Sequence, residues 1–186
     1  MPVAGLSGVP AAAARELRNR YTAADLSVFT RAEARRFDPR GDGDPHNDMV
    51  LAWELLYRLE PELYDRLASA ERLHPRVVAW LPHGLDRIVE VGAGAGRLTL
   101  ELIGRAREVV AVEPALPLRR FLRRKLAAAG HGERVRVASG FFDRLPVPDE
   151  FADLVAACSA SPPRRDTAAR PAWPRWSGCA GRAGAW

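Results

Sequence analysis

The sequence is poor in cysteine and has no long apolar run, and each scarcity excludes a class of protein. Its 186 residues include only Cys158 and Cys179, which have neither metal-ligand spacing nor the number that a disulfide framework needs. No apolar run is long enough to cross a bilayer. The N-terminus has no basic residue ahead of its weakly apolar stretch, so it is a poor secretion signal. We therefore expect a cytoplasmic protein with no metal site and no membrane partner.

Outside the C-terminal segment, basic residues barely outnumber acidic ones. The formal net charge of +5 would suit a nucleic-acid partner. However, residues 161–186 hold five of the 28 basic residues and only one of the 23 acidic residues. Residues 1–160 therefore carry a net charge of +1. We expect no nucleic-acid partner, because the excess charge lies almost entirely in that last segment.

Residues 1–84 have a mostly helical pattern and predict an N-terminal helical extension. Apolar side chains recur there at three- and four-residue spacing, as at Leu51, Leu55, Leu56 and Leu59. Pro61 is expected to break or restart the helix. Residues 37–48 form a polar stretch rich in glycine and proline. Because its acids lack the spacing of a calcium loop, we interpret it as a solvated loop.

From residue 85 the pattern changes to alternating strands and helices. The sequence predicts strands over residues 87–91, 108–113, 133–139 and 152–160, and helices over 97–107 and 116–130, the second ending at Gly130. This order implies a parallel sheet with right-handed crossovers. Residues 85–160 are thus expected to be a Rossmann-like α/β unit with four strands.

A glycine-rich turn joins the first of these strands to the first helix. Gly92, Gly94 and Gly96 stand at every second position, where glycine permits a tight turn and a close approach of ligand to backbone. The dinucleotide fingerprint needs a further glycine, but Arg97 and Thr99 occupy the two places it could take. The spacing therefore disfavours a nicotinamide-dependent oxidoreductase.

Two acids accompany the glycines. Glu113 ends the second predicted strand, where a carboxylate can accept hydrogen bonds from two ribose hydroxyls. Glu90 lies within the first strand, and it either organises the loop or pairs with a nearby arginine. Together with the strand–helix–strand context, these acids predict a nucleoside site.

This constellation resembles the class I S-adenosylmethionine-dependent methyltransferases. The matching segments are "VEVGAGAGRLT" (89–99), "VVAVEPA" (109–115) and "DRLPVPDEFADLVAACSA" (143–160). The resemblance implies S-adenosylmethionine as the cofactor and a methyl transfer as the activity. It places the loop backbone, Gly92, Ala93, Gly94 and Gly96, against the methionine and ribose portion. It also implies that Glu113 binds the ribose hydroxyls and that Glu90 helps hold the amino end of the cofactor.

One position departs from the family pattern. Many members carry an acid after the third strand that contacts the adenine amino group, and Phe141 stands there. Two interpretations stay open for Phe141 and Phe142: they pack against the purine, or they are core residues. Asp143 is a candidate substitute for the missing acid.

The residues do not identify a catalytic group or the acceptor. The cofactor's sulfonium is already activated, so the protein must mainly align the acceptor. Ser161-Pro162-Pro163 is similar to a motif of amino-group methyltransferases, but Arg164 replaces its stacking aromatic. We interpret that similarity as accidental. The leading interpretation is a methyltransferase of small-molecule type, and the sequence does not identify the acceptor itself. Trp53, Tyr57 and Tyr64 either line an acceptor pocket under a helical lid or belong to the core. The sequence does not predict an oligomeric state.

Residues 161–186 change abruptly in character. Apolar periodicity ends, and arginine, proline, alanine, glycine and tryptophan dominate. Reading their codons in another frame permits a helix followed by "RPGG", a turn typical of the family, so we expect an out-of-frame segment. The chain would then lack the later strands of the fold and be unstable and weakly active. The alternative function is a non-catalytic, cofactor-binding remnant.

Overall fold

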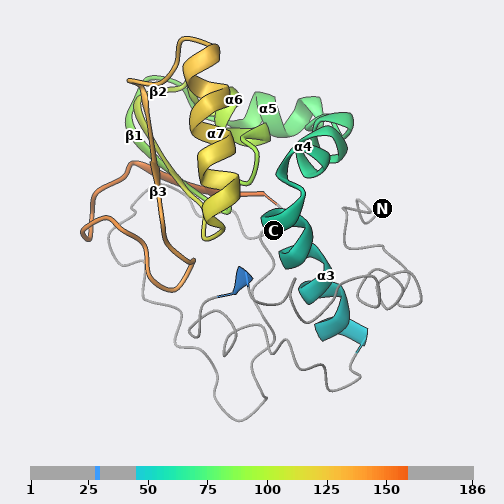
Figure 1. The fold of residues 1–186 in the computed structure, drawn as a ribbon. Helices are drawn as coiled ribbons and strands as arrows, with labels where there is room; N and C mark the ends of the chain where they lie inside the picture. Colours follow the sequence, from blue (N-terminus) through green and yellow to red (C-terminus); the bar gives the residue numbers. More distant parts are fainter. Residues whose placement is uncertain (1–27, 30–44, 159–186) are drawn as a thin grey trace.

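A computed structural model describes residues 28–29 and 45–158 of the chain (Figure 1). The predictions for residues 161–186, and for the part of the polar stretch before Pro45, lie outside the described residues. Residues 45–48 were expected to be loop, and that prediction is wrong, because a helix begins at Pro45. Proline suits the first turn of a helix, where its missing N–H would have no partner within the helix.

In the part of the chain that the structure describes, three helices precede the sheet, which confirms the helical pattern over residues 45–84. They are α3 (Pro45–Leu59), α4 (Pro61–Ala70) and α5 (Pro75–Trp80). The chain breaks between α3 and α4 at Glu60, and Pro61 starts the new helix, as expected. Figure 1 shows α3 and α4 beside α7, the long helix that packs on the sheet. Within the described residues, no helix has the length and apolar character that a membrane crossing needs.

The sheet is parallel and confirms the predicted α/β fold. Its strands are β1 (Leu85–Val91), β2 (Ala106–Val112), β3 (Val135–Ala138) and β4 (Leu154–Ala157), in the order β3-β2-β1-β4. Val91 is in register with Val112 of β2 and with Ala157 of β4. The carboxyl ends of the two central strands therefore meet at one edge, where ligands bind in open α/β sheets.

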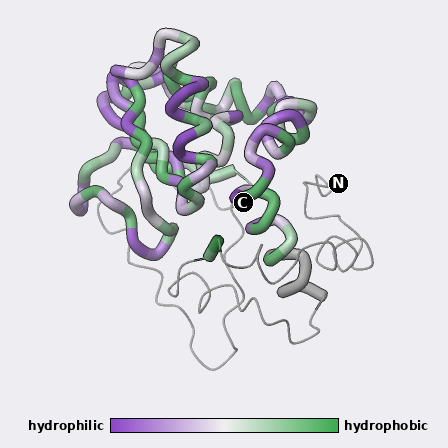
Figure 2. The backbone as a smooth tube through the Cα atoms, in the orientation of Figure 1, coloured by the Kyte–Doolittle hydropathy of each residue, from purple (hydrophilic) through white to green (hydrophobic). Residues whose placement is uncertain are grey.

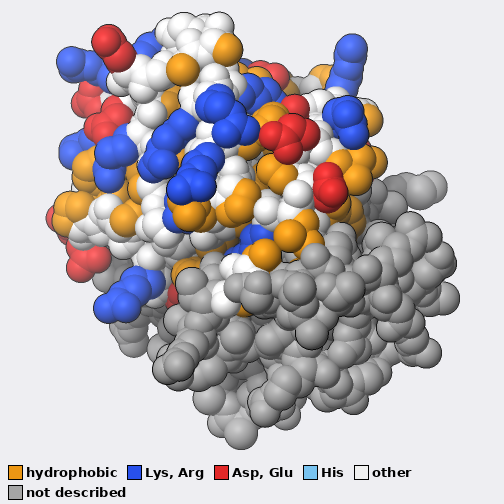
Figure 3. Space-filling view, in the orientation of Figure 1, with side chains coloured by type: hydrophobic (Ala, Val, Ile, Leu, Met, Phe, Trp, Pro, Cys, Tyr) orange, Lys and Arg blue, Asp and Glu red, His pale blue; other side chains and the backbone are white. Residues whose placement is uncertain are grey.

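Both faces of the two central strands, β1 and β2, are buried over their carboxyl-terminal halves, as is typical of parallel sheets. One face packs against α6 (Arg97–Leu102) and α7 (Leu116–Ala128), chiefly through leucines of the two helices (Leu98, Leu102, Leu122 and Leu126). The other face packs against the segment between β3 and β4, chiefly through the valines of β1 and β2 (Val89, Val91, Val110 and Val112). Figure 2 shows hydrophobic residues along the strands and hydrophilic ones over much of α7. Figure 3 shows Lys and Arg side chains gathered over α7, whose exposed arginines are Arg120, Arg123 and Arg124.

The helix expected over residues 97–107 is shorter, since α6 ends at Leu102. A turn follows, and β2 begins at Ala106 rather than at residue 108. Pairing with β1 accounts for the earlier start, because Leu85 is in register with Ala106. The helix over 116–130 is confirmed, and Gly130 takes the left-handed conformation with φ 74° just after its end.

Candidate cofactor site

The glycine turn is a tight loop that joins β1 to α6 at the carboxyl edge of the sheet. Gly92, Gly94 and Gly96 all have left-handed backbone, with φ of 73°, 55° and 91°. The amides of Gly92 and Ala93 donate to the Val112 carbonyl oxygen at 2.9 and 3.0 Å. Two backbone hydrogen bonds therefore hold the loop to the end of β2.

Two of these glycines are needed for different neighbours. A Cβ at position 96 would lie 2.5 Å from Leu122 Cδ1, so Gly96 lets α7 pack against the loop. A Cβ at position 94 would lie 3.0 Å from the hydroxyl oxygen of Tyr64 and 3.1 Å from its Cε1. Gly94 therefore faces an aromatic side chain of α4.

Glu113 lies at the centre of the candidate site, and the residue is only 4% exposed. Its Oε2 accepts from the Gly94 amide at 2.9 Å, and its Oε1 accepts from the Ala115 amide at 2.7 Å. Burial raises the pKa of this carboxyl to about 7, although the two amide donors oppose the shift. The charge of Glu54 on α3 further raises this pKa, and the charge of Arg58 on the same helix lowers it.

Glu90 lies inside β1 and is 2% exposed. The Thr99 hydroxyl donates to its Oε2 at 2.5 Å, so the carboxyl fixes the first turn of α6. Burial raises the pKa of Glu90 to about 8, against the lowering effect of the Thr99 hydrogen bond. The partner is thus a hydroxyl and not an arginine. The sequence indicated Thr99 only as a position without the further glycine, because no pattern along the chain marks its contact with Glu90.

Phe141 and Phe142 pack against different apolar clusters. Phe141 packs against the cluster of Phe29, Leu51 and Leu55, which involves α3. Phe142 packs against the strand valines on one face of the sheet. Both phenylalanines are half-buried beside these clusters. A contact of either ring with a purine stays a prediction.

The three aromatic residues of the first helices form a row that reaches the glycine loop. The Trp53 and Tyr57 ring centroids are 6.1 Å apart, and those of Tyr57 and Tyr64 are 4.7 Å apart in an edge-to-face arrangement. Burial raises the pKa of Tyr64 to about 12, with a further contribution from the Glu113 charge. Burial also raises the pKa of Tyr57 well above its ordinary value. Both hydroxyls are therefore protonated at neutral pH.

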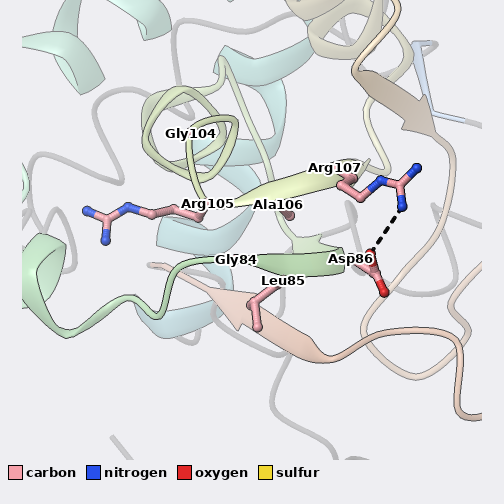
Figure 4. A pocket seen from close by; sticks show the side chains of 7 residues that line it. All are labelled: Gly84, Leu85, Asp86, Gly104, Arg105, Ala106 and Arg107. Carbon is pink, nitrogen blue, oxygen red and sulfur yellow. Dashed lines mark ion pairs between the residues drawn. The ribbon is translucent and has the colours of Figure 1, made fainter.

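A surface cavity of about 370 Å³ lies elsewhere, at the amino ends of β1 and β2 (Figure 4). Its lining includes Leu85, Asp86, Arg105 and Arg107, and Figure 4 shows the ion pair between Asp86 and Arg107 at its side. This is the opposite end of the strands from the carboxyl edge that carries the loop and Glu113. We assign the site to the carboxyl edge, because the buried carboxylates converge there.

Comparison with known proteins agrees with this geometry. The family described as "Methyltransferase domain" matches residues 88–173. An uncharacterized methyltransferase of Geobacillus thermodenitrificans is 36% identical over 115 residues, which are 61% of this chain and 51% of the relative. Ribosomal RNA small subunit methyltransferase A of a Synechococcus strain is 33% identical over 99 residues, covering 52% of this chain and 32% of that protein.

Among solved structures, the chain is similar to an S-adenosylmethionine-dependent methyltransferase of Thiobacillus denitrificans in complex with S-adenosyl-L-homocysteine. It is 20% identical, covers 53% of this chain and 43% of its own, and has a TM-score of 0.41. The chain spans about half the length of the Geobacillus relative. Over residues 88–173, the chain is therefore similar to the methyltransferase domain family, and its motifs resemble those of the class I S-adenosylmethionine-dependent methyltransferases.

Proposed function

We propose that this protein transfers a methyl group from S-adenosylmethionine to a small-molecule acceptor. The observation that supports it most is the 2.9 Å hydrogen bond from the Gly94 amide to Glu113 Oε2. It joins the loop after β1 to the carboxylate after β2. These are the two places that the family resemblance assigns to the cofactor.

The residues at this edge suit the chemistry of the cofactor. An ionised Glu113 is an acceptor-only group, and it can receive hydrogen bonds from both ribose hydroxyls. The absence of a Cβ at Gly94 allows close approach to the loop backbone. Glu90 is bonded to Thr99, so its contribution is to hold the loop and the start of α6 in place.

Methyl transfer mainly requires the protein to orient the two reactants. When bound, the cofactor supplies a methyl group already activated on sulfur. Orientation of the reactants by the protein can lower the barrier by about 7–11 kcal/mol. Tyr57 and Tyr64 are protonated at neutral pH because burial raises the pKa of each, so they serve as hydrogen-bond donors. We assign no catalytic base.

Substitution of Glu113 tests the cofactor assignment. Glu113→Gln keeps the shape but loses the charge, and we expect S-adenosylhomocysteine to bind about 10- to 100-fold more weakly by calorimetry. Glu108→Gln is the matched control, because Glu108 lies on β2, the strand that Glu113 follows, with its side chain 42% exposed. Unchanged binding by Glu113→Gln would contradict the assignment, as would tighter binding of a nicotinamide dinucleotide than of S-adenosylhomocysteine.

The acceptor class needs a separate measurement. The Synechococcus relative is named for ribosomal RNA. The protein should therefore be incubated with methyl-labelled S-adenosylmethionine, once with a small-molecule extract and once with total RNA. We expect the label in the small-molecule fraction, and label in RNA would overturn the proposed acceptor class. Binding without transfer to either fraction would support the alternative of a non-catalytic cofactor-binding protein.

A further inference from the structure

Helix α4 lies against the glycine loop and forms ion pairs with basic side chains of α6 and α7. Three acids of α4 and its C-terminal end take part: Glu62 with Arg124 at 3.3 Å, Asp65 with Lys125 at 2.7 Å, and Glu71 with Arg97 at 3.1 Å. We call these three ion pairs the clasp. All three acids lie on one segment and all three bases on the sheet-bound helices, so the clasp holds the helical extension to the Rossmann-like unit.

Two bases of the clasp also contact the cofactor edge of the sheet. Lys125 donates to the Ala95 carbonyl of the glycine loop at 3.1 Å. Arg97 donates to the Glu71 carbonyl at 3.2 Å and to Cys158 Sγ, just after β4, at 3.4 Å. The position of α4 is therefore coupled to the loop and to the end of β4.

The clasp holds the Tyr64 side chain against the glycine loop. Its ring and hydroxyl lie against Gly94, whose amide is bonded to Glu113. Both carboxylate oxygens of Glu113 already accept backbone amides, and the residue is only 4% exposed. A ribose that bonded to Glu113 would have to enter the space beside Gly94 that Tyr64 fills.

We propose that α4 is a self-closing lid: in the closed position Tyr64 covers the cofactor face of the glycine loop, and the cofactor binds only after the clasp opens. This inference rests on the proposed function. The Glu62–Arg124 pair has side chains 60% and 65% exposed, and the other two pairs are partly exposed. Pairs of this kind are individually weak, so the lid can open at equilibrium. The apparent cofactor affinity is then reduced by the fraction of molecules that are open.

The test weakens the clasp without touching the loop. Asp65→Asn and Glu71→Gln each remove one ion pair, and Asp86→Asn is the matched control. Asp86 pairs with Arg107 at 3.7 Å, with both side chains well exposed, beside the cavity at the opposite end of the strands (Figure 4). Hydrogen exchange of the amides of residues 92–96 in the full chain reports opening without any cofactor. Calorimetry with S-adenosylhomocysteine reports affinity.

For each clasp variant we expect amide exchange in the loop about two- to fivefold faster, and S-adenosylhomocysteine bound tighter by a similar factor. The control should change neither quantity. Unchanged exchange in both variants would overturn the lid. Weaker binding would also overturn it, because the clasp would then help to retain the cofactor. Faster exchange with no binding by any variant, wild type included, would support the closing contact and overturn the proposed function instead.

Discussion

Gly94 and Gly96 share the left-handed conformation but serve different neighbours. Gly96 starts α6 with φ 91° and leaves room for Leu122 of α7. Gly94 leaves room for Tyr64 and sends its amide to Glu113. The requirement for glycine at position 96 is thus a matter of packing within the fold. At position 94, the missing Cβ also decides how closely another group, such as the Tyr64 side chain, approaches the loop.

Gly96→Ala should destabilise the protein more than Gly84→Ala. The new Cβ would come 2.5 Å from Leu122 Cδ1, and the backbone would keep an unfavourable φ. We expect a loss of about 2–4 kcal/mol in the free energy of unfolding, measured with urea. Gly84→Ala is the control, because Gly84 has φ 72° with open space around it and so carries only the backbone cost, about 1–2 kcal/mol. Equal losses in the two variants would show that Leu122 moves aside freely.

The site acids were predictable from sequence, but their partners were not. Glu90 and Glu113 stand out as acids in or just after apolar strands, and a ligand contact of either stays a prediction. The Thr99 hydroxyl on Glu90 and the Tyr64 ring on Gly94 come from contacts between separate elements. Sequence periodicity describes one element at a time, so such contacts carry no pattern along the chain.

At the scale of elements, the order of strands and helices was predictable and their ends were less so. The apolar spacing of residues 98–103 continues toward Gly104, so it predicts a longer helix than α6. The actual boundary is set by pairing, because the Leu85 amide donates to the Arg105 carbonyl at 3.0 Å and extends β2 backwards. Strand pairing is a long-range property, which local patterns do not contain.

Arg105 should be the residue that docks α5 onto the sheet. Its guanidinium donates to the Leu81 carbonyl at 2.7 Å and to the Val78 carbonyl at 2.9 Å, both at the end of the helix. Charged donors there also suit the helix dipole. We expect Arg105→Ala to lower the free energy of unfolding by about 1–3 kcal/mol in a urea titration. Arg107→Ala, whose side chain is 86% exposed, should change it by less than about 0.5 kcal/mol. A similar loss in both variants would contradict the docking role.

At the scale of the whole molecule, the division of the chain stays a prediction. The boundary at residue 85 coincides with the start of β1. The family match continues to residue 173, past the boundary proposed at residue 160. DNA sequence across codons 158–170 is the measurement that decides the out-of-frame hypothesis, and an uninterrupted alternative frame without the family-like residues would end it. The cytoplasmic location also stays a prediction.

Stability of the whole molecule should fall as pH rises from about 4.5 to about 8. Burial raises the pKa of Glu113 to about 7 and that of Glu90 to about 8, from an ordinary value of 4.5. Between these values the folded state binds more protons than the unfolded state, so the free energy of unfolding decreases with increasing pH. Below pH 4.5 both carboxyls are neutral in both states, and the stabilisation is fully present.

Glu90→Gln isolates this effect, because glutamine keeps an oxygen to accept from Thr99 but cannot ionise. We expect the wild type to lose up to a few kcal/mol between pH 5 and pH 8.5 in urea titrations, and the variant to lose clearly less. Glu108→Gln, at an exposed position of β2, should follow the wild-type curve. Parallel curves for wild type and Glu90→Gln would mean that Glu90 is ionised throughout this range. Its burial would then be compensated by the fold, and the pH dependence would have to come from Glu113.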